Sequence, residues 1–324
     1  MINPESGNTA CVFCGSSDSI VAYQTFDIFQ NNFDIRRCRN CDAWFLSPFP
    51  SKELLEKAYD VTYYGDQETK FKDGPIEKAL DSFRTVRAKR LAKLLPQNAR
   101  ILDIGCGNGN FLEFISRYGN FELHGIERDP KAAARALAKP GMQIKTTPLV
   151  EHDFAENFFH AITLFHVFEH LSNPSETLSI IDKILEPGGY LYISFPNIDS
   201  CQAKIFKGKW LHLDPPRHLL FFAPKTFIKL IGARGYDCVH VKYLSLEQNP
   251  YGMVQSVLNT FFSKREILFE RLKGNKDYAP ECGKFCTMMQ KLFFVASFPF
   301  FTVTDVFASM FHKGATVSFI FRKK

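Results

Sequence analysis

Residues 102–111 read Leu-Asp-Ile-Gly-Cys-Gly-Asn-Gly-Asn-Phe, and this stretch decides the fold. An apolar run predicts a β-strand over Arg100–Ile104, and glycines then occupy positions 105, 107 and 109. Glycine lets the backbone turn sharply and lie against a ligand with no Cβ in the way. The first turn of the helix that follows offers free N–H groups. The stretch therefore predicts a strand, a tight ligand-binding turn and a helix.

Short apolar strands and helices alternate along the chain from this turn onward. The predicted strands are Arg100–Ile104, Glu122–Ile126, Gln143–Thr146, His160–Phe165, Tyr190–Ser194 and Cys238–Tyr243, with a last strand at Ala315–Arg322. The predicted helices are Gly109–Tyr118, Pro130–Leu137, Pro174–Leu185 and Lys225–Gly235. This alternation predicts an α/β fold with a parallel sheet covered on both faces. Ligands of such sheets bind at the carboxyl ends of the strands.

An acid, Glu127, follows the second predicted strand and lies 18 residues past Gly109. At that place in an open α/β sheet a carboxylate accepts hydrogen bonds from both ribose hydroxyls. The alternative is that Glu127 and Asp129 only cap the helix that begins near Pro130. We assign Asp129 to the cap and Glu127 to a ribose. A dinucleotide-dependent dehydrogenase is disfavoured, because its loop reads G-x-G-x-x-G and this one reads G-x-G-x-G.

Four segments in this order resemble a class I S-adenosylmethionine-dependent methyltransferase. They are LDIGCGNGNF (102–111), HGIERDP (124–130), FHAITLFHVFEHLSNP (159–174) and LEPGGYLYISFPN (185–197). The resemblance covers roughly residues 75–244 and the last strand. It implies a Rossmann-like seven-stranded sheet whose last two strands form an antiparallel hairpin, and S-adenosylmethionine as cofactor.

The same resemblance assigns cofactor-binding residues by position. Asp103 and the glycine turn would hold the methionine part of the cofactor, and Glu127 its ribose. Arg128 and His166 would also lie at the cofactor. The turn residues are Gly105, Cys106, Gly107, Asn108 and Gly109. After the third strand, Thr146–Glu151 lacks the acid that often binds the adenine amino group in this family, so no residue is assigned to adenine.

The fourth predicted strand runs into His166-Val167-Phe168-Glu169-His170. H-x-x-E-H also occurs in inverzincin proteases, but there the motif lies well inside a helix. Within the resemblance the segment lines the cofactor and substrate cleft, and related E-x-x-E-H turns bind a divalent metal. His166, Glu169 and His170 are therefore candidate ligands of a second metal, and Glu169 and His170 candidate catalytic residues. The alternative is that Glu169 and His170 brace the loop by hydrogen bonds.

Beyond the fifth strand, Trp210–His218 follows the pattern W-x-x-L-D-x-P-R-H. We predict His218 as general base, because neutral imidazole takes a hydroxyl proton near pH 7. Arg217 either forms a salt bridge or clamps a phosphorylated or carboxylated substrate. The pattern resembles methyltransferases of bacterial polysaccharide and secondary-metabolite pathways, and the domain also resembles ubiquinone-type O-methyltransferases. The expected acceptor is a hydroxyl of a small molecule, a sugar or a lipid-linked compound, ahead of carbon or nitrogen.

Two C-x-x-C pairs near the N-terminus are separated by 23 residues. Four thiolates on two tight turns complete a tetrahedral, structural Zn²⁺ site. The predicted ligands are Cys11, Cys14, Cys38 and Cys41. The spacer holds two β-like runs, Ile20–Phe26 and Phe33–Arg37, as in a zinc ribbon. It carries few basic residues, so nucleic acid is not expected as a partner. The other five cysteines are expected to be ordinary thiols: Cys106, Cys201, Cys238, Cys282 and Cys286.

The chain has 324 residues, of which 45% are apolar and 23% charged, as in a folded globular protein. Its net charge of +6 does not indicate which class of partner it binds. Of its 34 phenylalanines, 11 fall in residues 245–312. This helical insertion is interpreted as a subdomain that buries its own aromatics, a homodimer interface, or a surface that meets lipid through residues 285–311. Its longest uncharged apolar run, Leu292–Thr304, is interrupted by Pro299 and too short to span a bilayer.

The sequence therefore predicts four parts. They are a zinc ribbon (1–50), a helical linker or cover (51–98), an S-adenosylmethionine-binding domain (99–244 and 313–324) and the Phe-rich insertion (245–312). The N-terminus lacks the pattern of a signal peptide, so the cytoplasm is expected, with the inner face of the membrane as the site of any lipid contact. Two alternatives stay open: a non-catalytic scaffold with this fold, and a nucleic-acid methyltransferase.

Overall fold

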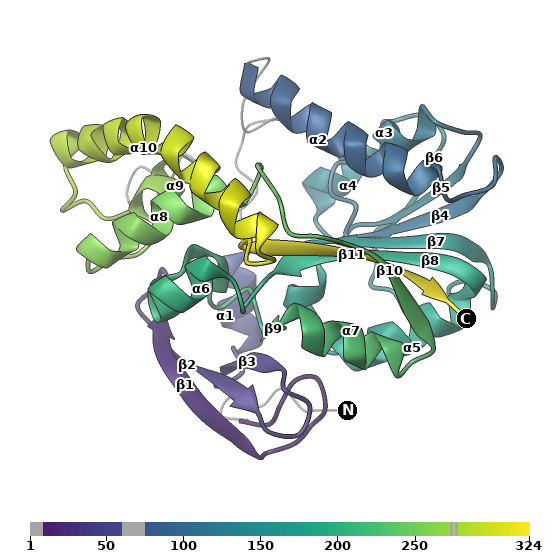
Figure 1. Ribbon diagram of the computed structural model, residues 1–324, viewed down its shortest axis with the longest axis horizontal. Coiled ribbons are helices and arrows are strands. Elements are labelled where there is room, and N and C mark those ends of the chain that lie inside the picture. The colour runs from purple at the N-terminus through teal and green to yellow at the C-terminus, as the bar shows by residue number, and fades with distance from the viewer. Residues whose placement is uncertain (1–8, 60–74, 273–274, 276–277) are drawn as a thin grey trace. The chain divides into compact units, whose positions relative to one another are not determined.

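The computed structural model describes residues 9–59, 75–272, 275 and 278–324 (Figure 1). Two compact units, each with its own sheet, make up the chain. Unit 1 comprises residues 1–77, 196–226 and 243–317, and unit 2 comprises residues 78–195, 227–242 and 318–324. Part of the expected helical cover, residues 60–74, lies outside the described residues.

Unit 2 is built on a mostly parallel sheet of seven strands. They are β4 (Arg100–Ile104), β5 (Glu122–Ile126), β6 (Met142–Lys145), β7 (Phe159–Phe165), β8 (Leu185–Pro196), β10 (Tyr236–Lys242) and β11 (Thr316–Lys323). Their order is β10-β11-β8-β7-β4-β5-β6, and β10 runs antiparallel to β11. Strands β5, β4, β7 and β8 pair in parallel. The predicted α/β fold with its terminal hairpin is confirmed.

Helices cover both faces of this sheet. They are α2 (Pro75–Ala92), α3 (Asn110–Ser116), α4 (Pro130–Leu137), α5 (Pro174–Ile184) and α7 (Pro224–Gly232), with a 3₁₀ turn at Phe168–His170. Figure 1 shows α2, α3 and α4 on one side and α5 and α7 on the other. Ile320 of β11 faces the core under α2–α4, whereas its neighbours Phe319 and Phe321 stack against Phe227 of α7. This alternation along one strand places an apolar core on each side of the sheet.

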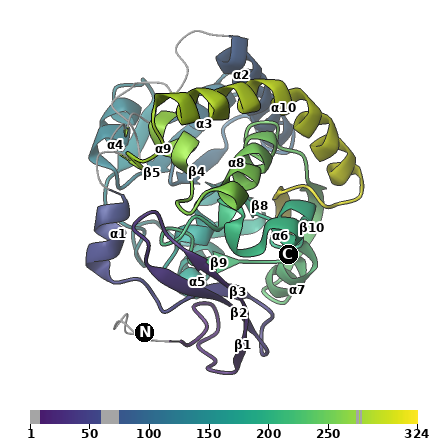
Figure 2. The same cartoon turned by 90° about the vertical axis from the view of Figure 1, so that its left-hand side faces the viewer.

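Unit 1 contains a second, antiparallel sheet at the N-terminus. Its strands are β1 (Ser19–Phe26), β2 (Asn32–Cys38), β3 (Trp44–Ser47) and β9 (Leu220–Phe221), in the order β1-β2-β3-β9 (Figure 2). The first two match the β-like runs of the predicted ribbon. The last is a two-residue strand from the loop after β8, and its residues Leu220 and Phe221 pair with Phe45 and Trp44.

This pairing changes the predicted domain boundary. The sequence places residues 196–226 in the domain 99–244, whereas the structure groups them with the ribbon. The physical reason is a shared apolar core, in which Trp210, Leu219 and Phe221 of the loop pack with Phe33 and Ile35 of β2. Short helices flank this core: α1 (Lys52–Ala58), α6 (Cys201–Phe206) and the 3₁₀ turns Lys207–Lys209 and Leu211–Leu213.

The Phe-rich insertion is helical, as predicted. It forms α8 (Asn249–Phe261), α9 (Ile267–Leu272) and α10 (Lys284–Met310). The expected break at Pro299 does not occur: α10 continues through it for 27 residues, and Pro299 lies on an exposed part of the helix, where solvent can hydrate the carbonyl that the ring leaves without a donor. The expectation that no segment is long enough to span a bilayer is therefore corrected. By length and composition alone, α10 is the one helix among the described residues that could cross a membrane.

One pair of cysteines also differs from the prediction. Cys282 and Cys286, expected to be separate thiols, are joined by a disulfide bond at the start of α10. Their separation of four residues places both side chains on neighbouring turns, close enough for bonding. The other seven cysteines are free.

Arg265 ties the insertion to the rest of unit 1. Its side chain is 1% exposed and donates hydrogen bonds to the Phe26 carbonyl of β1 and to the Trp210 carbonyl of the loop, both at 2.9 Å. It also pairs with its neighbour Glu266 at 2.8 Å. The insertion, the ribbon and the loop are therefore one packed body, which the sequence pattern did not indicate.

Candidate functional site

The glycine turn follows β4 and is bonded to the end of β5. The N–H groups of Gly105 and Cys106 both donate to the Ile126 carbonyl, at 2.7 and 3.0 Å. Gly105 has a φ of +71°, and a Cβ there would lie 2.3 Å from Cγ2 of Val167. Gly107 has a φ of +55°, and no atom lies within 4 Å of its Cβ position. Gly105 is therefore needed for packing, whereas Gly107 leaves open space beside the backbone.

Glu127 is fixed at the carboxyl end of β5. Its Oε2 accepts the N–H of Gly107 and its Oε1 accepts the N–H of Asp129, both at 2.8 Å. The residue is 7% exposed. Each carboxylate oxygen keeps further acceptor capacity, so the group can still accept bonds from a pair of hydroxyls. Asp129 caps α4 by accepting the N–H of Ala132 at 2.7 Å, so its predicted capping role is confirmed.

Asp103 is the last polar residue of β4 and is 3% exposed. The hydroxyl of Thr163 on β7 donates to its Oδ1 at 2.6 Å. Burial raises the pKa of Asp103 to about 7, against the smaller lowering effects of Thr163 and Arg87. A cation beside this carboxyl would favour its ionised form. Thr163 was not among the predicted site residues, although a hydroxyl inside the apolar run 161–165 is the signal for it.

The remaining predicted cofactor residues differ in exposure. Cys106 is buried, and burial raises the pKa of its thiol, which makes it a packing residue rather than a nucleophile. Asn108 is half-buried within the turn, and Arg128 is exposed beside Glu127 in the sequence. The structure therefore brings the glycine turn and Glu127 together, with Asp103 buried in the adjacent strand.

His166 stands at the carboxyl end of β7 in a left-handed conformation, with a φ of +56°. Its N–H donates to the Ser194 carbonyl of β8 at 2.9 Å. Its Nδ1 lies 3.4 Å from Oε1 of Glu169, which is 1% exposed. His170 donates its N–H to the Val167 carbonyl at 3.0 Å and closes the 3₁₀ turn. The 3.4 Å contact is an ion pair when His166 is protonated.

His218 belongs to unit 1 and is 8% exposed. Its Nδ1 lies 2.8 Å from the carbonyl oxygen of His212. Because a carbonyl only accepts, Nδ1 carries the proton, and in the neutral ring Nε2 holds the lone pair. Nε2 lies 3.7 Å from Oδ2 of Asp214, whose charge would stabilise the imidazolium that forms when Nε2 takes a proton. This is the tautomer that a general base requires.

Arg217 forms a salt bridge inside unit 1. Its side chain pairs through two nitrogens with the carboxylate of Asp214, one of them at 3.0 Å, and donates from Nη1 to the Ala58 carbonyl at 3.3 Å. The residue is 2% exposed. With its guanidinium used in this way, the structure favours the salt bridge over the anion clamp.

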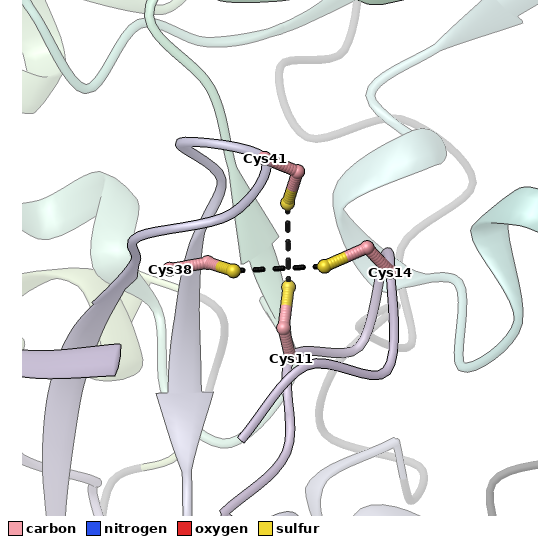
Figure 3. A group of neighbouring side chains, drawn as sticks. All are labelled: Cys11, Cys14, Cys38 and Cys41. Atoms are coloured by element: carbon pink, nitrogen blue, oxygen red, sulfur yellow. Dashed lines mark hydrogen bonds between the residues drawn. The ribbon is translucent and has the colours of Figure 1, made fainter. Parts of the chain in front are cut away.

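The four cysteines of the ribbon converge on one point (Figure 3). Their Sγ atoms all lie within 4.8 Å of one another. The Sγ atoms of Cys11 and Cys41 are 3.6 Å apart, and those of Cys14 and Cys38 are 3.5 Å apart. Zn–S bonds of about 2.3 Å in a tetrahedron place the sulfurs about 3.8 Å apart, so the four thiols fit a zinc ion. Asn40 donates from Nδ2 to the Cys14 sulfur at 3.6 Å, as a supporting contact.

Comparison with known sequences supports the same fold. Residues 80–241, half of the chain, match the family described as "Methyltransferase domain". A ubiquinone biosynthesis O-methyltransferase of Xanthomonas axonopodis pv. citri is 32% identical over 132 residues, which cover 39% of this chain and 54% of that protein. The corresponding protein of Caulobacter sp. is 34% identical over 107 residues, 31% of this chain and 42% of that one. The chain spans about half the length of the curated relatives it matches.

Solved structures show the same architecture. The [4+2]-cyclase SpnF superposes with a TM-score of 0.51 at 17% identity, over 80% of this chain and 86% of that one. A protein described as a sarcosine dimethylglycine methyltransferase from Galdieria sulphuraria gives 0.50 at 14% identity, over 80% and 91%. At these identities the likeness concerns the fold alone. Since the sequence match lies on the seven-stranded sheet with the glycine turn, the chain belongs to the methyltransferase domain family and to the class I S-adenosylmethionine-dependent methyltransferases.

Proposed function

We propose that the chain transfers a methyl group from S-adenosylmethionine to a hydroxyl of a small-molecule, sugar or lipid-linked acceptor. The observation that carries the proposal is the hydrogen bond from Gly107 to Glu127, which holds a carboxylate beside the open backbone of the turn. The relatives named as O-methyltransferases support oxygen as the acceptor atom.

The residues of unit 2 would hold the cofactor. Glu127 would accept hydrogen bonds from the ribose hydroxyls, and the backbone of Gly105–Gly109 would lie against the methionine part. Asp103, with its pKa raised to about 7, would ionise beside the positive charge of that part. When bound, S-adenosylmethionine supplies the methyl group, whose bond to sulfur breaks as a bond to the acceptor oxygen forms.

His218 is the proposed general base of this reaction. Because Nδ1 donates to the His212 carbonyl, the lone pair of the neutral ring is on Nε2, which would take the acceptor hydroxyl proton. Asp214 would stabilise the resulting imidazolium. His166 and His170 are proposed to line the cofactor side of the site. No step of the reaction is assigned to a second metal.

The ribbon cysteines are proposed to bind a structural Zn²⁺. The supporting facts are the sulfur–sulfur distances of 3.5 and 3.6 Å and the donor set of four thiols. A site with four protein ligands leaves no open position for substrate. The metal would stabilise the ribbon, and through β9 the loop that carries His218.

The test follows methyl transfer directly, because a protein of the same fold is named as a cyclase. Titration calorimetry with S-adenosylmethionine comes first, and no heat of binding would favour the non-catalytic scaffold. Tritium from the labelled methyl group is then followed into hydroxylated aromatics, sugars, polyprenyl-linked sugars, RNA and DNA. Label in an ether of one of the first three classes supports the proposal, whereas label in RNA or DNA alone contradicts it.

A further inference from the structure

Helix α10 has a packed face that fixes it to the rest of unit 1. Phe294, Phe298 and Phe301 pack against a core formed by Val254 of α8 and its neighbours. Figures 1 and 2 both show α10 lying beside α8.

A buried polar contact strengthens this attachment. Asp305 is 3% exposed and accepts a hydrogen bond from Nδ2 of Asn249 at 3.0 Å. Burial raises the pKa of Asp305 to about 6. Helix α8 is itself tied to the loop after β8, since Nδ2 of Asn259 donates to the Lys209 carbonyl at 3.1 Å, so α10 is fixed to unit 1 through residues 293–305.

The opposite face of α10 is apolar and exposed. At 3.6 residues per turn its exposed large side chains fall on one side of the helix and form one stripe, at positions 285, 288, 289, 292, 295, 300, 303, 306, 307 and 310. Six of them span the helix and are 56–72% exposed: Phe285, Leu292, Val295, Phe300, Phe307 and Met310. Only 6% of the most apolar window of this helix is buried. An apolar stripe of this length marks an interaction surface.

The charges of α10 indicate what this surface meets. The helix contains three charged residues: Lys284, Lys291 and Asp305. Both lysines are exposed, whereas the single acid is buried. The lysines are seven residues apart, or two helical turns, so they lie along the same edge of the stripe. Long lysine side chains at such an edge reach phosphate groups while their stems stay with the apolar surface.

We propose that α10 docks on the surface of an anionic phospholipid bilayer, with its stripe in the acyl boundary and its lysines at the lipid phosphates. An amphipathic helix with a basic edge binds in this way, parallel to the membrane plane. Spanning the bilayer is disfavoured, because it would place Asp305 in the hydrocarbon layer and detach the packed phenylalanines from α8. A second copy of the chain is disfavoured as well, because lysine is depleted from protein–protein interfaces.

Vesicle flotation tests this proposal on the full chain. The vesicles contain phosphatidylcholine alone or with phosphatidylglycerol. We expect the protein to float with the anionic vesicles, and at least tenfold less with the neutral ones. The double variant Phe300→Glu/Phe307→Glu should remain at the bottom of the gradient. The pair Lys284→Glu/Lys291→Glu should lose the preference for anionic lipid. Phe261→Glu, at a 76% exposed phenylalanine of α8, is the matched control and should float as the parent does.

A thermal midpoint and a circular dichroism spectrum equal to those of the parent show that each variant is folded, because the substituted residues lie in unit 1 and cofactor binding in unit 2 would not report on them. Three results overturn the proposal. The parent protein fails to float with anionic vesicles, the double phenylalanine variant floats unchanged, or bound protein resists extraction by alkaline carbonate as a spanning helix does. If the parent does not bind vesicles but forms a dimer, and the phenylalanine variant is monomeric, the stripe is an interface with a second copy of the chain instead.

Discussion

The backbone N–H of Gly107 lies 2.8 Å from Oε2 of Glu127, so the turn after one strand is bonded to the acid at the end of its neighbour. Glu127 thereby does two things: it shapes the glycine turn and it presents a carboxylate at the edge where ligands bind. A carboxylate that accepts two backbone N–H groups cannot rotate freely. Its oxygens are therefore positioned before a ligand arrives, which lowers the entropy lost on binding.

Glu127→Gln should weaken S-adenosylmethionine binding about ten- to a hundredfold, because the amide gives up the charge and turns one acceptor into a donor facing an N–H group. Titration calorimetry measures the change. Glu122→Gln is the matched control, because Glu122 lies at the opposite end of β5 from Glu127. This variant should bind S-adenosylmethionine as tightly as the parent does. Equal affinity of both variants would remove Glu127 from the cofactor site.

Gly105→Ala and Gly107→Ala should separate packing from binding. At Gly105 the new Cβ meets Val167 and the left-handed backbone is strained, so the free energy of unfolding should fall by about 2–4 kcal/mol. At Gly107 only the backbone strain applies, about 1–2 kcal/mol, while the Cβ occupies the open space beside the turn. Urea unfolding should rank Gly105→Ala as less stable. Calorimetry should show a loss of cofactor affinity in the folded Gly107→Ala protein.

The pH dependence of cofactor binding should report on Asp103. Its pKa is raised to about 7 from the usual 3.8, so the carboxyl is protonated in the folded protein below pH 7. A cationic ligand favours the ionised form, and affinity should therefore rise as the pH increases through about 7. Calorimetry in buffers of different ionisation enthalpy should detect proton release on binding. The Asp103→Asn variant should release fewer protons, and an unchanged proton count would contradict the assignment.

The same residue makes a stability prediction with a definite sign. A raised folded-state pKa contributes stability that is fully present below pH 3.8 and is lost as the pH rises through about 7. Without cofactor, the difference in thermal midpoint between the parent and Asp103→Asn should shift in favour of the variant between pH 6 and pH 8. A difference that is independent of pH would show that the carboxyl does not titrate in this range.

His218→Ala should lower kcat by about 10²–10⁴-fold while the affinity for S-adenosylmethionine persists, because the variant loses only the proton acceptor. His312→Ala provides the control, because His312 is exposed and packs on Tyr243. A His218→Ala enzyme with normal turnover would refute the role of base.

Cys14→Ser should lower the zinc content below one ion per chain and destabilise unit 1, as a ribbon of this size depends on its metal. Mass spectrometry of the metal and thermal unfolding measure both effects. Cys201→Ser, at a half-buried free thiol, should keep the zinc. Binding of S-adenosylhomocysteine should survive in Cys14→Ser, because the cofactor residues belong to unit 2. Full zinc content in Cys14→Ser would exclude this cysteine as a ligand.

Much of unit 2 follows from local sequence signals. The bounds of β4, β5 and α4 agree with the predicted ones, because a β-rich apolar run, a glycine turn or a capping acid followed by proline marks each end. The predictions fail where the cause is distant in sequence. Strand β9 is two residues long and has no pattern of its own, since its partner in β3 lies about 175 positions earlier.

In the candidate site, too, the features marked by local sequence were predicted, and those that depend on distant contacts were not. Glu127 was predicted because a fixed spacing from the glycine turn marks it, and the structure adds the bond to Gly107 that no spacing reveals. The tautomer of His218 depends on a main-chain carbonyl, and a sequence does not show where carbonyls point. The continuation of α10 through Pro299 depends on the exposed side of the helix, which is set by packing on α8.

The pairing of β9 with β3 has a consequence for how this protein can be shortened. Residues 80–241, which match the family, look like a self-contained catalytic piece. That piece would carry Leu220 and Phe221 without Trp44 and Phe45, and would leave an apolar strand edge and half of a core open to water. The N-terminal ribbon and the segment with His218 therefore have to be kept, transplanted or inherited together, although about 170 residues of chain separate them.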